Sequence, residues 1–452
     1  MSAALAIYHR LPARARDAIA SGRGLYLLAW RYGLDSERLV AEALERDTWP
    51  RERMRAYQEE LLARILHRAA TRVPFYREAW ARRRARGERV NVERLEAWPV
   101  LEKEDLRASP RGFIADDRNP RTMSMSASSG TSGTPVKIWS SREVLIRWYA
   151  IFDARCRRWY GIERSDPWAM LGGQLVVPFE RRTPPFWVWN APMRQLYMSS
   201  YHLSPAFLPS YLEALERYGV KHLLGYTSSL HALAEAALAV GRTFPVKVAI
   251  ANAEPVEPRQ RTAIERALGP VRETYGMTEM AAGASECEAG KLHLWPDAGL
   301  VEADAEDLIC TTLLSDDMPL VRYRVGDRGR LAAPEATCAC GRTLPILEAI
   351  DGRADDVLFT RDGRRIGRLD PVFKADLPIR EAQIVQEALD RIVVRLVPTR
   401  GFGSEHEASI ADRLRERLGD VAVVFEHLDE VPRTSSGKFR AVVSKLPARR
   451  AE

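Results

Sequence analysis

Three short apolar strands separated by two helices constrain the fold of this 452-residue chain more than any other feature. The strands are expected at Lys221–Tyr226, Val246–Asn252 and Val271–Tyr275, and the helices at Ser228–Val240 and Pro258–Leu268. Parallel strands need crossover connections, so this alternation predicts a largely parallel sheet covered by helices. Further helices are expected around 142–160 and 205–218. The fold class is therefore α/β.

The flanking regions have different patterns. Residues 1–110 are expected to be mostly helical, because Met54, Tyr57, Leu61 and Ile65 recur at spacings of three and four. From about residue 291 the helical pattern ends. The sequence there predicts a β-rich subdomain over about 285–350, with short strands at 292–295, 307–313, 320–325 and 328–331.

A polar stretch around Gly352–Asp356 precedes a compact C-terminal unit. A chain of this length is too long for one hydrophobic core. We therefore expect a large domain over residues 1–354 and a small α+β lid domain over residues 355–452. The lid should contain a hairpin, a helix and a last strand, at 382–388 with 391–398, at 405–418 and at 421–428.

A hydroxyl-rich loop precedes the α/β pattern. It has no large apolar residue before Val136, so it is not a core strand or an amphipathic helix. Its glycines allow close backbone approach, and successive N–H groups could form a nest for phosphate. The alternative is a flexible linker, which the Pro-x-Lys exit and the apolar segment after it disfavour. The candidate phosphate-binding residues are Ser128, Ser129, Gly130, Thr131, Ser132, Gly133, Thr134 and Lys137.

Composition restricts the class of protein. The chain is 46% hydrophobic and 29% charged, as expected for a globular protein, and no apolar run is long enough to span a bilayer. Residues 1–24 do not have the pattern of a signal peptide. Five cysteines, an odd number, favour a reducing cytoplasm. The net charge of +7 suits anionic ligands.

Four further motifs follow the loop in order. Tyr275-Gly276-Met277-Thr278-Glu279 comes directly after a predicted strand, where α/β folds place ligand contacts. Tyr323-Arg324-Val325-Gly326-Asp327 ends a strand, and Gly352-Arg353-Ala354-Asp355-Asp356 lies at the proposed domain boundary. Pro432-Arg433-Thr434-Ser435-Ser436-Gly437-Lys438 lies near the end of the chain. Each of these motifs alone could be a solvated turn.

Together and in this order, the five motifs resemble the adenylate-forming superfamily, which includes acyl- and aryl-CoA ligases, luciferases and peptide-synthetase adenylation domains. Val73-Pro74-Phe75-Tyr76-Arg77 and Pro99–Leu106 are similar to the phenylacetate-CoA ligase branch. Gly363–Asp370 and Glu381–Val385 resemble its capsule-biosynthesis, CapK-like relatives. The resemblance covers most of the chain. It implies the activation of a carboxylic acid by ATP, which gives an acyl-adenylate and pyrophosphate.

The resemblance also implies residue roles. The loop would hold the β- and γ-phosphates of ATP, and Glu279 would hold Mg²⁺, a cation that prefers carboxylate oxygen. Tyr275, with Ala253 and Glu254 alongside, would lie near adenine, and Gly276 and Thr278 belong to the same nucleotide site. Asp327 would accept hydrogen bonds from the ribose hydroxyls. Arg353 would approach ribose and phosphate, Asp355 would be the hinge, and Lys438 would stabilise charge at the reacting carboxylate.

The acceptor of the acyl group remains open. Many acyl-CoA ligases follow the hinge with a glycine-containing loop and a Pro-x-Glu segment. Gly363 is present here, but Asp370-Pro371-Val372-Phe373 has no glutamate. The expected acceptor is a thiol such as coenzyme A, and the alternatives are a carrier-protein thiol, an amine or a hydroxyl. Adenylation of a cofactor is a further alternative.

Cys287, His293, Cys338 and Cys340 form a separate constellation. Two tight clusters of soft ligands fit a closed, structural Cys₃His zinc site. The alternative is three unrelated thiols and a surface histidine.

Two other kinds of protein, a non-catalytic assembly protein and a nucleic-acid-binding protein, would have different sequence patterns. A non-catalytic assembly protein would be expected to lose the ATP-site residues, yet Lys438, Glu279 and Asp327 are all present. A nucleic-acid-binding protein would be expected to cluster Lys and Arg with aromatic residues, whereas the basic residues here are dispersed. We therefore expect no nucleic-acid partner.

Overall fold

The N-terminal part of the chain is helical, as predicted. The computed structural model describes residues 3–89, 91–127, 135–203, 206–305, 307–351, 358–366, 369–373, 377–429, 431–432 and 441–446. Prolines mark helix starts: Pro12 and Pro50 precede two helices, and Pro74 is the first residue of a third, where its missing N–H is not needed. The helices are α1 (Ala3–Arg10), α2 (Ala13–Arg31), α3 (Ser36–Arg46), α4 (Arg51–Arg72), α5 (Pro74–Ala85) and α6 (Lys103–Ala108).

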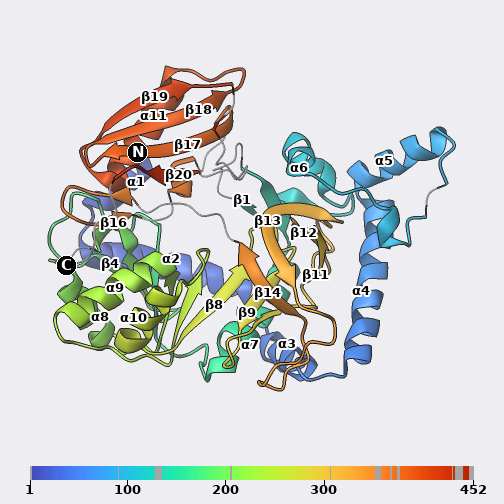
Figure 1. The fold of residues 1–452 in the computed structure, drawn as a ribbon, viewed down its shortest axis with the longest axis horizontal. Coiled ribbons are helices and arrows are strands. Elements are labelled where there is room, and N and C mark those ends of the chain that lie inside the picture. The colour runs from blue at the N-terminus through green and yellow to red at the C-terminus, as the bar shows by residue number, and fades with distance from the viewer. Residues whose placement is uncertain are drawn as a thin grey trace.

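A twelve-stranded sheet forms the centre of the large domain (Figure 1). One half is parallel, in the order β8-β7-β6-β3-β5, with antiparallel β4 at the edge. This half confirms the predicted alternation. Its elements are β3 (Trp168–Gly172), β4 (Trp187–Asn190), β5 (Gln195–Ser199), β6 (His222–Tyr226), β7 (Val248–Asn252), β8 (Val271–Gly276), α7 (Arg142–Cys156), α8 (Leu208–Arg217), α9 (Thr227–Ala239) and α10 (Pro258–Leu268).

Helices cover both faces of the parallel half. Successive side chains of a strand point to opposite faces, and β7 shows this directly. Ala249 and Ala251 pack with residues of α8, α9 and α10, whereas Val248 and Ile250 pack with residues of α7. Figure 1 shows α8, α9 and α10 grouped together beside the parallel strands. The strands are therefore apolar on both faces, which is why they read as continuous apolar runs in the sequence.

The other half of the sheet is antiparallel and continues from β8 without a break. The β-rich region is thus part of the central sheet. The two strands predicted at 320–325 and 328–331 are wrong in detail: one strand covers Tyr323–Leu331, and Leu320–Arg322 lie outside it. The strands of this half are β9 (Gly283–Glu286), β10 (Leu292–Leu294), β11 (Gly299–Asp304), β12 (Asp307–Thr312), β13 (Tyr323–Leu331) and β14 (Ile346–Asp351).

A separate four-stranded sheet forms the C-terminal unit, in the order β19-β18-β17-β20. Its hairpin, helix and last long strand lie close to the predicted positions. None of the helices in the described residues combines the length and the apolar character needed to cross a membrane. The elements are β15 (Leu358–Phe359), β16 (Arg365–Ile366), β17 (Ile379–Ala388), β18 (Arg391–Pro398), α11 (Ser404–Leu418), β19 (Ala422–His427) and β20 (Val442–Ser444).

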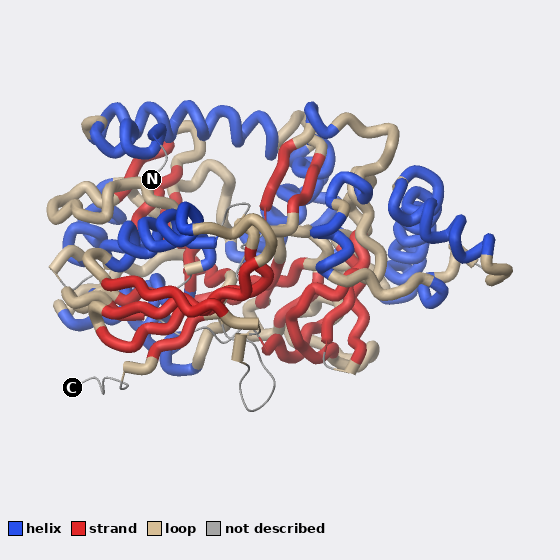
Figure 2. The backbone as a smooth tube through the Cα atoms, turned by 90° about the horizontal axis from the view of Figure 1, so that it is seen from above, coloured by secondary structure: helices blue, strands red, loops and turns tan. Residues whose placement is uncertain are grey.

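The C-terminal unit packs on the large domain through a shared hydrophobic core. Phe179 and Tyr201 of the large domain belong to the core that β17, β18 and α11 build. The buried guanidinium of Arg364 donates a hydrogen bond to the Tyr201 carbonyl at 2.8 Å and lies 4.1 Å from the Phe179 ring centre. Figures 1 and 2 show the C-terminal sheet over the β4 end of the large sheet.

Two hairpin strands flank the hydroxyl-rich loop. They are β1 (Ser124–Ala127) and β2 (Lys137–Ser140), paired antiparallel with Ala127 opposite Lys137. Residues 128–134 lie outside the described residues. The loop therefore connects two paired strands, and Lys137 is the first residue of the second one.

Candidate nucleotide site and metal cluster

Two tyrosine–carboxylate hydrogen bonds join the second and third sequence motifs. Tyr275, near the end of β8, donates its hydroxyl to Asp327 Oδ2 at 3.0 Å. Tyr323, on β13, donates to Glu279 Oε1 at 2.9 Å, and the Glu279 side chain is 7% exposed. Four residues separated by up to 52 positions are thus brought together where β8 ends and β13 begins. The predicted site residues Tyr275, Glu279 and Asp327 share this region.

The Tyr275 phenol stays protonated in this region. Burial, with a further contribution from the Asp327 carboxylate, raises its pKa well above the usual value. The hydroxyl is consequently a hydrogen-bond donor at any physiological pH. One oxygen of Asp327 is therefore already engaged, and the ribose contact expected for this residue would use the remaining acceptor capacity.

Backbone strain marks the same region. Ala253, directly after β7, has φ of 64°, and Met280, next to Glu279, has φ of 51°. Positive φ is uncommon for residues other than glycine, and such strain clusters at functional sites. Gly276 ends β8 and is exposed, and Thr278 lies in the turn after it. Both strained residues flank the tyrosine–carboxylate pairs.

Glu254 has a structural partner in the next element. Its carboxylate accepts from the Ser228 backbone N–H at 2.7 Å and from the Ser228 hydroxyl at 3.2 Å, and the Thr227 hydroxyl donates to its carbonyl. Carboxylates are favourable at a helix N-terminus, so Glu254 ties the end of β7 to the start of α9. Its contribution at this site is to hold the strained Ala253 in place.

Polar groups also converge at the ends of β3 and β7. The Tyr201 hydroxyl donates to the Gly173 carbonyl at 2.7 Å, and a side chain at Gly173 would begin 3.1 Å from the hydroxyls of both Tyr201 and Tyr226. Tyr226 pairs in register with Asn252, whose Oδ1 is buried without a hydrogen-bond partner in the described part of the chain. A side chain at position 173 would therefore be tightly packed against both phenols, which would have to shift slightly to admit it.

Arg353, Asp355 and Lys438 lie outside the described residues, as do Ser128–Thr134 of the loop. The described part of the predicted site therefore consists of the two tyrosine–carboxylate pairs and the ends of β7 and β8, and Lys137 lies on β2. Tyr323 is the residue that sequence reasoning missed. The available signal was its position as the first residue of the Tyr-Arg-Val-Gly-Asp motif, four residues before Asp327.

Cys287, His293, Cys338 and Cys340 come together as predicted: their ligand atoms all lie within 4.8 Å of one another. Cys287 Sγ is 3.6 Å from Cys338 Sγ, and Cys340 Sγ is 3.4 Å from His293 Nε2. Ligands about 2.3 Å from a tetrahedral zinc ion would be about 3.7 Å apart. The donor set and its spacing fit zinc, with His293 offering Nε2.

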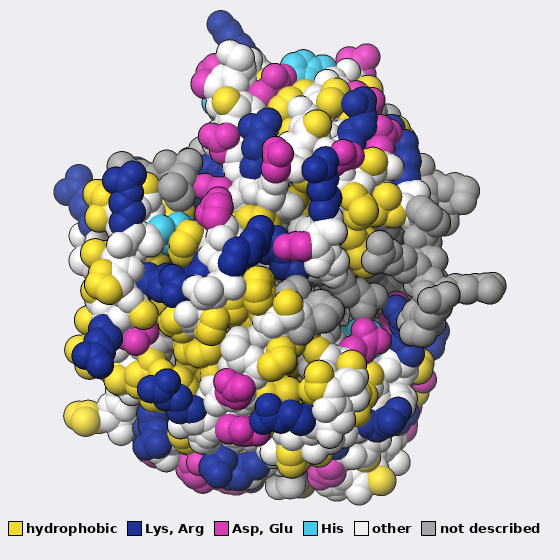
Figure 3. Space-filling view, turned by 90° about the vertical axis from the view of Figure 1, so that its left-hand side faces the viewer, with side chains coloured by type: hydrophobic (Ala, Val, Ile, Leu, Met, Phe, Trp, Pro, Cys, Tyr) yellow, Lys and Arg dark blue, Asp and Glu magenta, His cyan; other side chains and the backbone are white. Residues whose placement is uncertain are grey.

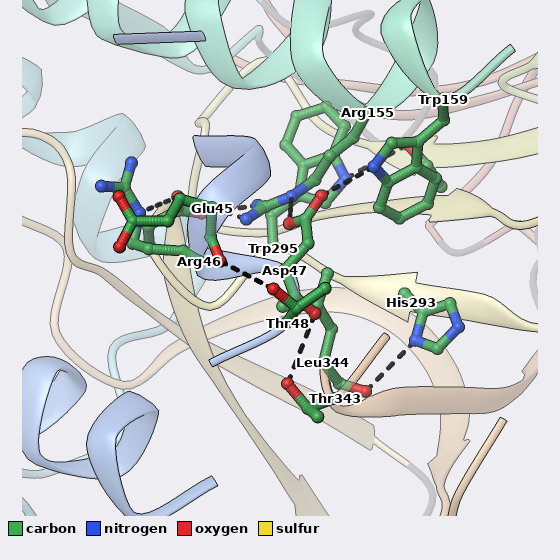
Figure 4. A network of polar contacts seen from close by, with 12 residues as sticks. Glu45, Arg46, Asp47, Thr48, Arg155, Trp159, His293, Trp295, Thr343 and Leu344 are labelled. Atoms are coloured by element: carbon green, nitrogen blue, oxygen red, sulfur yellow. Dashed lines mark hydrogen bonds and ion pairs between the residues drawn. The ribbon is translucent and has the colours of Figure 1, made fainter. Parts of the chain in front are cut away.

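The second layer around this cluster orients its ligands (Figure 4). His293 Nδ1 faces the Leu344 carbonyl at 3.2 Å, which leaves Nε2 for a metal. The Trp159 ring stands edge-on to His293, and its Nε1–H donates to Asp47 Oδ2 at 2.7 Å. This carboxylate also accepts from the buried Arg155 at 2.9 Å. The cluster is thus connected to a buried ion-pair network.

Arg155 is the centre of that network. Besides Asp47, it binds Asp297 with an Nη1–Oδ1 distance of 2.6 Å, and all three side chains are at most 3% exposed. Burial opposes ionisation of Asp297, but Arg155 and Arg46 hold the pKa of its carboxyl below the usual range. The network joins α3, α7 and the antiparallel half of the sheet.

Comparison with known proteins identifies relatives of the chain. The C-terminal domain family of CapK matches residues 358–445. Protein CapK of Staphylococcus aureus is 25% identical over 385 residues, covering 82% of this chain and 85% of CapK. Phenylacetate-coenzyme A ligase of Thermus thermophilus is 29% identical over 348 residues, covering 70% of this chain and 74% of the ligase.

The fold agrees with these relationships. A solved structure of 2-hydroxyisobutyryl-CoA ligase superimposes with a TM-score of 0.53 at 22% identity, covering 88% of this chain and 91% of that chain. At this identity the likeness concerns the fold. The chain is thus homologous to CapK and to the phenylacetate-coenzyme A ligases.

Proposed function

We propose that the protein is an ATP-dependent, AMP-forming ligase. It activates a carboxylic acid to an acyl-adenylate and passes the acyl group to a thiol, most simply that of coenzyme A. The observation that carries this proposal is the pairing of Tyr275 with Asp327 and of Tyr323 with Glu279 where β8 ends and β13 begins. Homology to phenylacetate-coenzyme A ligases supports both the activation step and the thiol acceptor.

In the first step a carboxylate oxygen of the acid attacks the α-phosphorus of ATP. The bond from that phosphorus to the bridging oxygen breaks, and pyrophosphate leaves with no net transfer of a proton. In this assignment Asp327 holds the ribose, and Glu279 holds Mg²⁺, which would neutralise phosphate charge. The hydroxyl of Tyr323 fixes the orientation of Glu279. Arg353 is assigned to ribose and phosphate, and the hydroxyl-rich loop with Lys137 to the β- and γ-phosphates.

Lys438 is assigned to the charge that develops between the carboxylate and the α-phosphate. In the second step a thiolate attacks the acyl carbonyl, the bond to the phosphate oxygen breaks, and AMP leaves. The thiol loses its proton in this step. Rotation of the C-terminal unit about Asp355 would separate the two steps, as lids and domains do in many enzymes.

We also propose a structural zinc ion at Cys287, His293, Cys338 and Cys340. All four positions of a tetrahedral ion would be filled by the chain, so this ion would fix structure and leave no position for substrate. The ligands lie on β10 and on the segments after β9 and before β14. Zinc would therefore hold together connections within the antiparallel half.

The test of the ligase activity combines a panel of carboxylic acids with ATP and Mg²⁺, and traps activated acyl groups with hydroxylamine. At least one acid should give hydroxamate and pyrophosphate. Lys438→Ala should lower this rate at least ~100-fold, as should Glu279→Gln, since each removes charge stabilisation at the reacting phosphate. Coenzyme A then replaces hydroxylamine to test the acceptor.

Lys445→Ala is the matched control, because Lys445 is an exposed lysine of the same C-terminal unit that pairs with Glu387 at 2.9 Å. It should retain the wild-type rate. If Lys438→Ala and Lys445→Ala behave alike, the assigned role of Lys438 is wrong. If no acid yields pyrophosphate, the ligase proposal itself fails.

A further inference from the structure

Helix α2 is anchored to the large sheet by one face only. Asp17 accepts from the Trp189 backbone N–H at 2.9 Å, and Ser21 bonds both the Trp189 carbonyl and the Ala191 N–H. These bonds satisfy the open edge of β4, which would otherwise expose unpaired backbone groups. Gly24 packs directly against Asn190, where a Cβ would begin 1.9 Å from its Oδ1. The anchored face of α2 is thus closely fitted. It combines these polar contacts with the packing of Ala20 on Val188 and Tyr197.

The outward face of α2 is apolar. Ordinary surface helices show the reverse, with apolar residues inward and charged residues outward. Here the exposed arc carries Ile19 at 49%, Leu25 at 61% and Tyr26 at 43% exposure, among small side chains at 15, 18, 22 and 29. Figure 2 shows α2 along the outer edge of the molecule, with no element beyond it. The arc is therefore available to a partner.

This region concentrates exposed apolar side chains. Eight large hydrophobic residues are exposed in the described residues, and five of them lie between residues 7 and 34. Besides the three on α2, they include Ile7 on α1 at 64% and Leu34 after α2 at 106%. We call the surface formed by Ile7, Ile19, Leu25, Tyr26 and Leu34 the α2 face. Five exposed large apolar residues within one segment of the chain favour an interaction surface, whereas single exposed apolar residues need no explanation.

Exposed arginines lie on α1 and α2, close in sequence to the α2 face. Residues 1–34 hold five arginines and one aspartate, a net charge of +4 out of +7 for the whole chain, and of these arginines Arg16 is buried. Arg10, Arg14 and Arg23 are exposed and form no ion pair with any described residue. The one acid, Asp17, is engaged with Trp189. By contrast, Figure 3 shows side chains of both signs interspersed over another side of the molecule.

We propose that the α2 face docks this protein on an anionic lipid surface. A helix that lies in a membrane interface combines an apolar face with arginines beside it and aromatic residues at the boundary. Tyr26 and Trp30, with ring centres 5.9 Å apart, would provide that boundary. A second copy of the chain fits less well, because a two-fold contact would bring the arginines of both copies together. The proposal does not depend on the ligase activity.

The test measures binding of the full-length protein to vesicles by flotation. One set contains phosphatidylcholine alone, and the other adds about one third phosphatidylglycerol. At low salt we expect at least tenfold tighter binding to the anionic set, since each exposed arginine near an anionic surface raises the affinity about fivefold. High salt should weaken this preference by screening it.

Three variants separate the apolar and the electrostatic contributions to vesicle binding. The triple variant Ile19→Gln, Leu25→Gln, Tyr26→Gln should lose at least ~90% of bound protein on both vesicle sets. Arg10→Gln, Arg14→Gln, Arg23→Gln should lose mainly the preference for anionic vesicles. Val240→Gln with Val424→Gln is the control, because both residues are exposed apolar residues outside the α2 face, at 52% and 36%. All variants should keep wild-type pyrophosphate release in solution.

Three results would overturn the proposal. One is no binding of wild-type protein to anionic vesicles at low salt. Another is a concentration-dependent dimer in sedimentation that the triple Gln variant dissolves, because the α2 face would then join two copies. Equal vesicle binding by the control and the triple variant would also assign the binding to another surface.

Discussion

Glu273 is a partly buried carboxyl close to Tyr275 of the candidate nucleotide site. It lies on β8, two positions before Tyr275, and its backbone N–H donates to Glu286 Oε2 at 2.7 Å. Burial and the neighbouring Glu286 carboxylate raise the pKa of Glu273 to about 7. A carboxyl whose folded pKa lies above its unfolded value costs stability when it ionises. This cost is absent below about pH 4.5 and is complete above about pH 7.

Glu273→Gln should therefore stabilise the protein at pH 8 and change little at pH 4. The expected gain at pH 8 is ~2 kcal/mol in the free energy of unfolding, because the amide has no charge to bury. Urea titrations at the two pH values measure it. Glu265→Gln, at an exposed glutamate of α10, should show no such pH dependence. Equal effects of Glu273→Gln at both pH values would contradict the assigned pKa.

At the residue scale, the sequence predicted the site best where the residue types have few common roles in proteins, as cysteine and histidine do. The spacing of Cys287, His293, Cys338 and Cys340 predicted that they would assemble, and the structure brings them within 4.8 Å. Three thiols and an imidazole in two tight clusters have a distinctive chemistry. Tyr323 has no comparable signal, because a tyrosine in a strand is most often a packing residue.

At the scale of elements, the segment that carries Cys338 and Cys340 connects the helical N-terminal part to the antiparallel strands. Thr343, three residues after Cys340, donates its N–H to the Asp47 carbonyl at 3.0 Å and its hydroxyl to the Trp49 carbonyl at 2.6 Å. Residues 47–50 join α3 to α4. A metal that fixes the Cys338–Cys340 turn therefore also fixes the place where these two helices meet.

Removing the metal should loosen this connection. Purified protein should contain about one zinc per chain, and chelation should lower Tm by at least ~5 °C, because binding energy of a structural metal is folding energy. Cys338→Ser should show the same loss and no further response to a chelator. Metal analysis with thermal unfolding makes both measurements.

Cys310→Ala is the control for this experiment. Cys310 is a buried thiol that lies outside the cluster. The variant should unfold at a lower temperature, as core truncations do, yet keep its zinc and its response to chelation. Wild-type protein that is free of zinc when purified without chelators would exclude the structural metal.

Element prediction worked best where periodicity is regular. Helix α10 has the predicted bounds, Pro258–Leu268, and its Glu257–Gln260 capping box marks the start. The prediction failed at β13, where two short strands were expected and one strand of nine residues is present. A register shift between Asp307 and Ile309 on the neighbouring strand accommodates this irregular segment. Such bulges depend on cross-strand pairing, which a local pattern does not record.

At the scale of the whole molecule, a shared hydrophobic core couples the large domain and the C-terminal unit. Phe179 is 4% exposed, and a Cβ at Gly419 of the C-terminal unit would lie 3.0 Å from its ring. Tyr201 contacts both parts: its hydroxyl binds Gly173 in the large domain, and its carbonyl binds Arg364 in the C-terminal unit. Unfolding of the two parts should accordingly be cooperative in the wild type.

Phe179→Ala should uncouple the two parts. Removing a buried phenylalanine costs about 3–5 kcal/mol, and here the loss falls on the shared core. Calorimetry should show one transition for the wild type and two for the variant. Phe186→Ala is the matched control, since Phe186 is fully buried within the large domain. It should lower Tm and keep a single transition. Two transitions in the wild type would refute the coupling.

The sequence by itself determined the type and order of the elements, because these depend on periodicity and end signals within a few turns of chain. It also determined which residues carry distinctive chemistry. The tertiary structure alone decided that the two halves form one sheet, that α2 covers β4 and that Tyr201 joins the two domains. Those contacts link residues up to 172 positions apart. They arise from which surfaces remain to be buried once the elements have formed, and that depends on the whole chain.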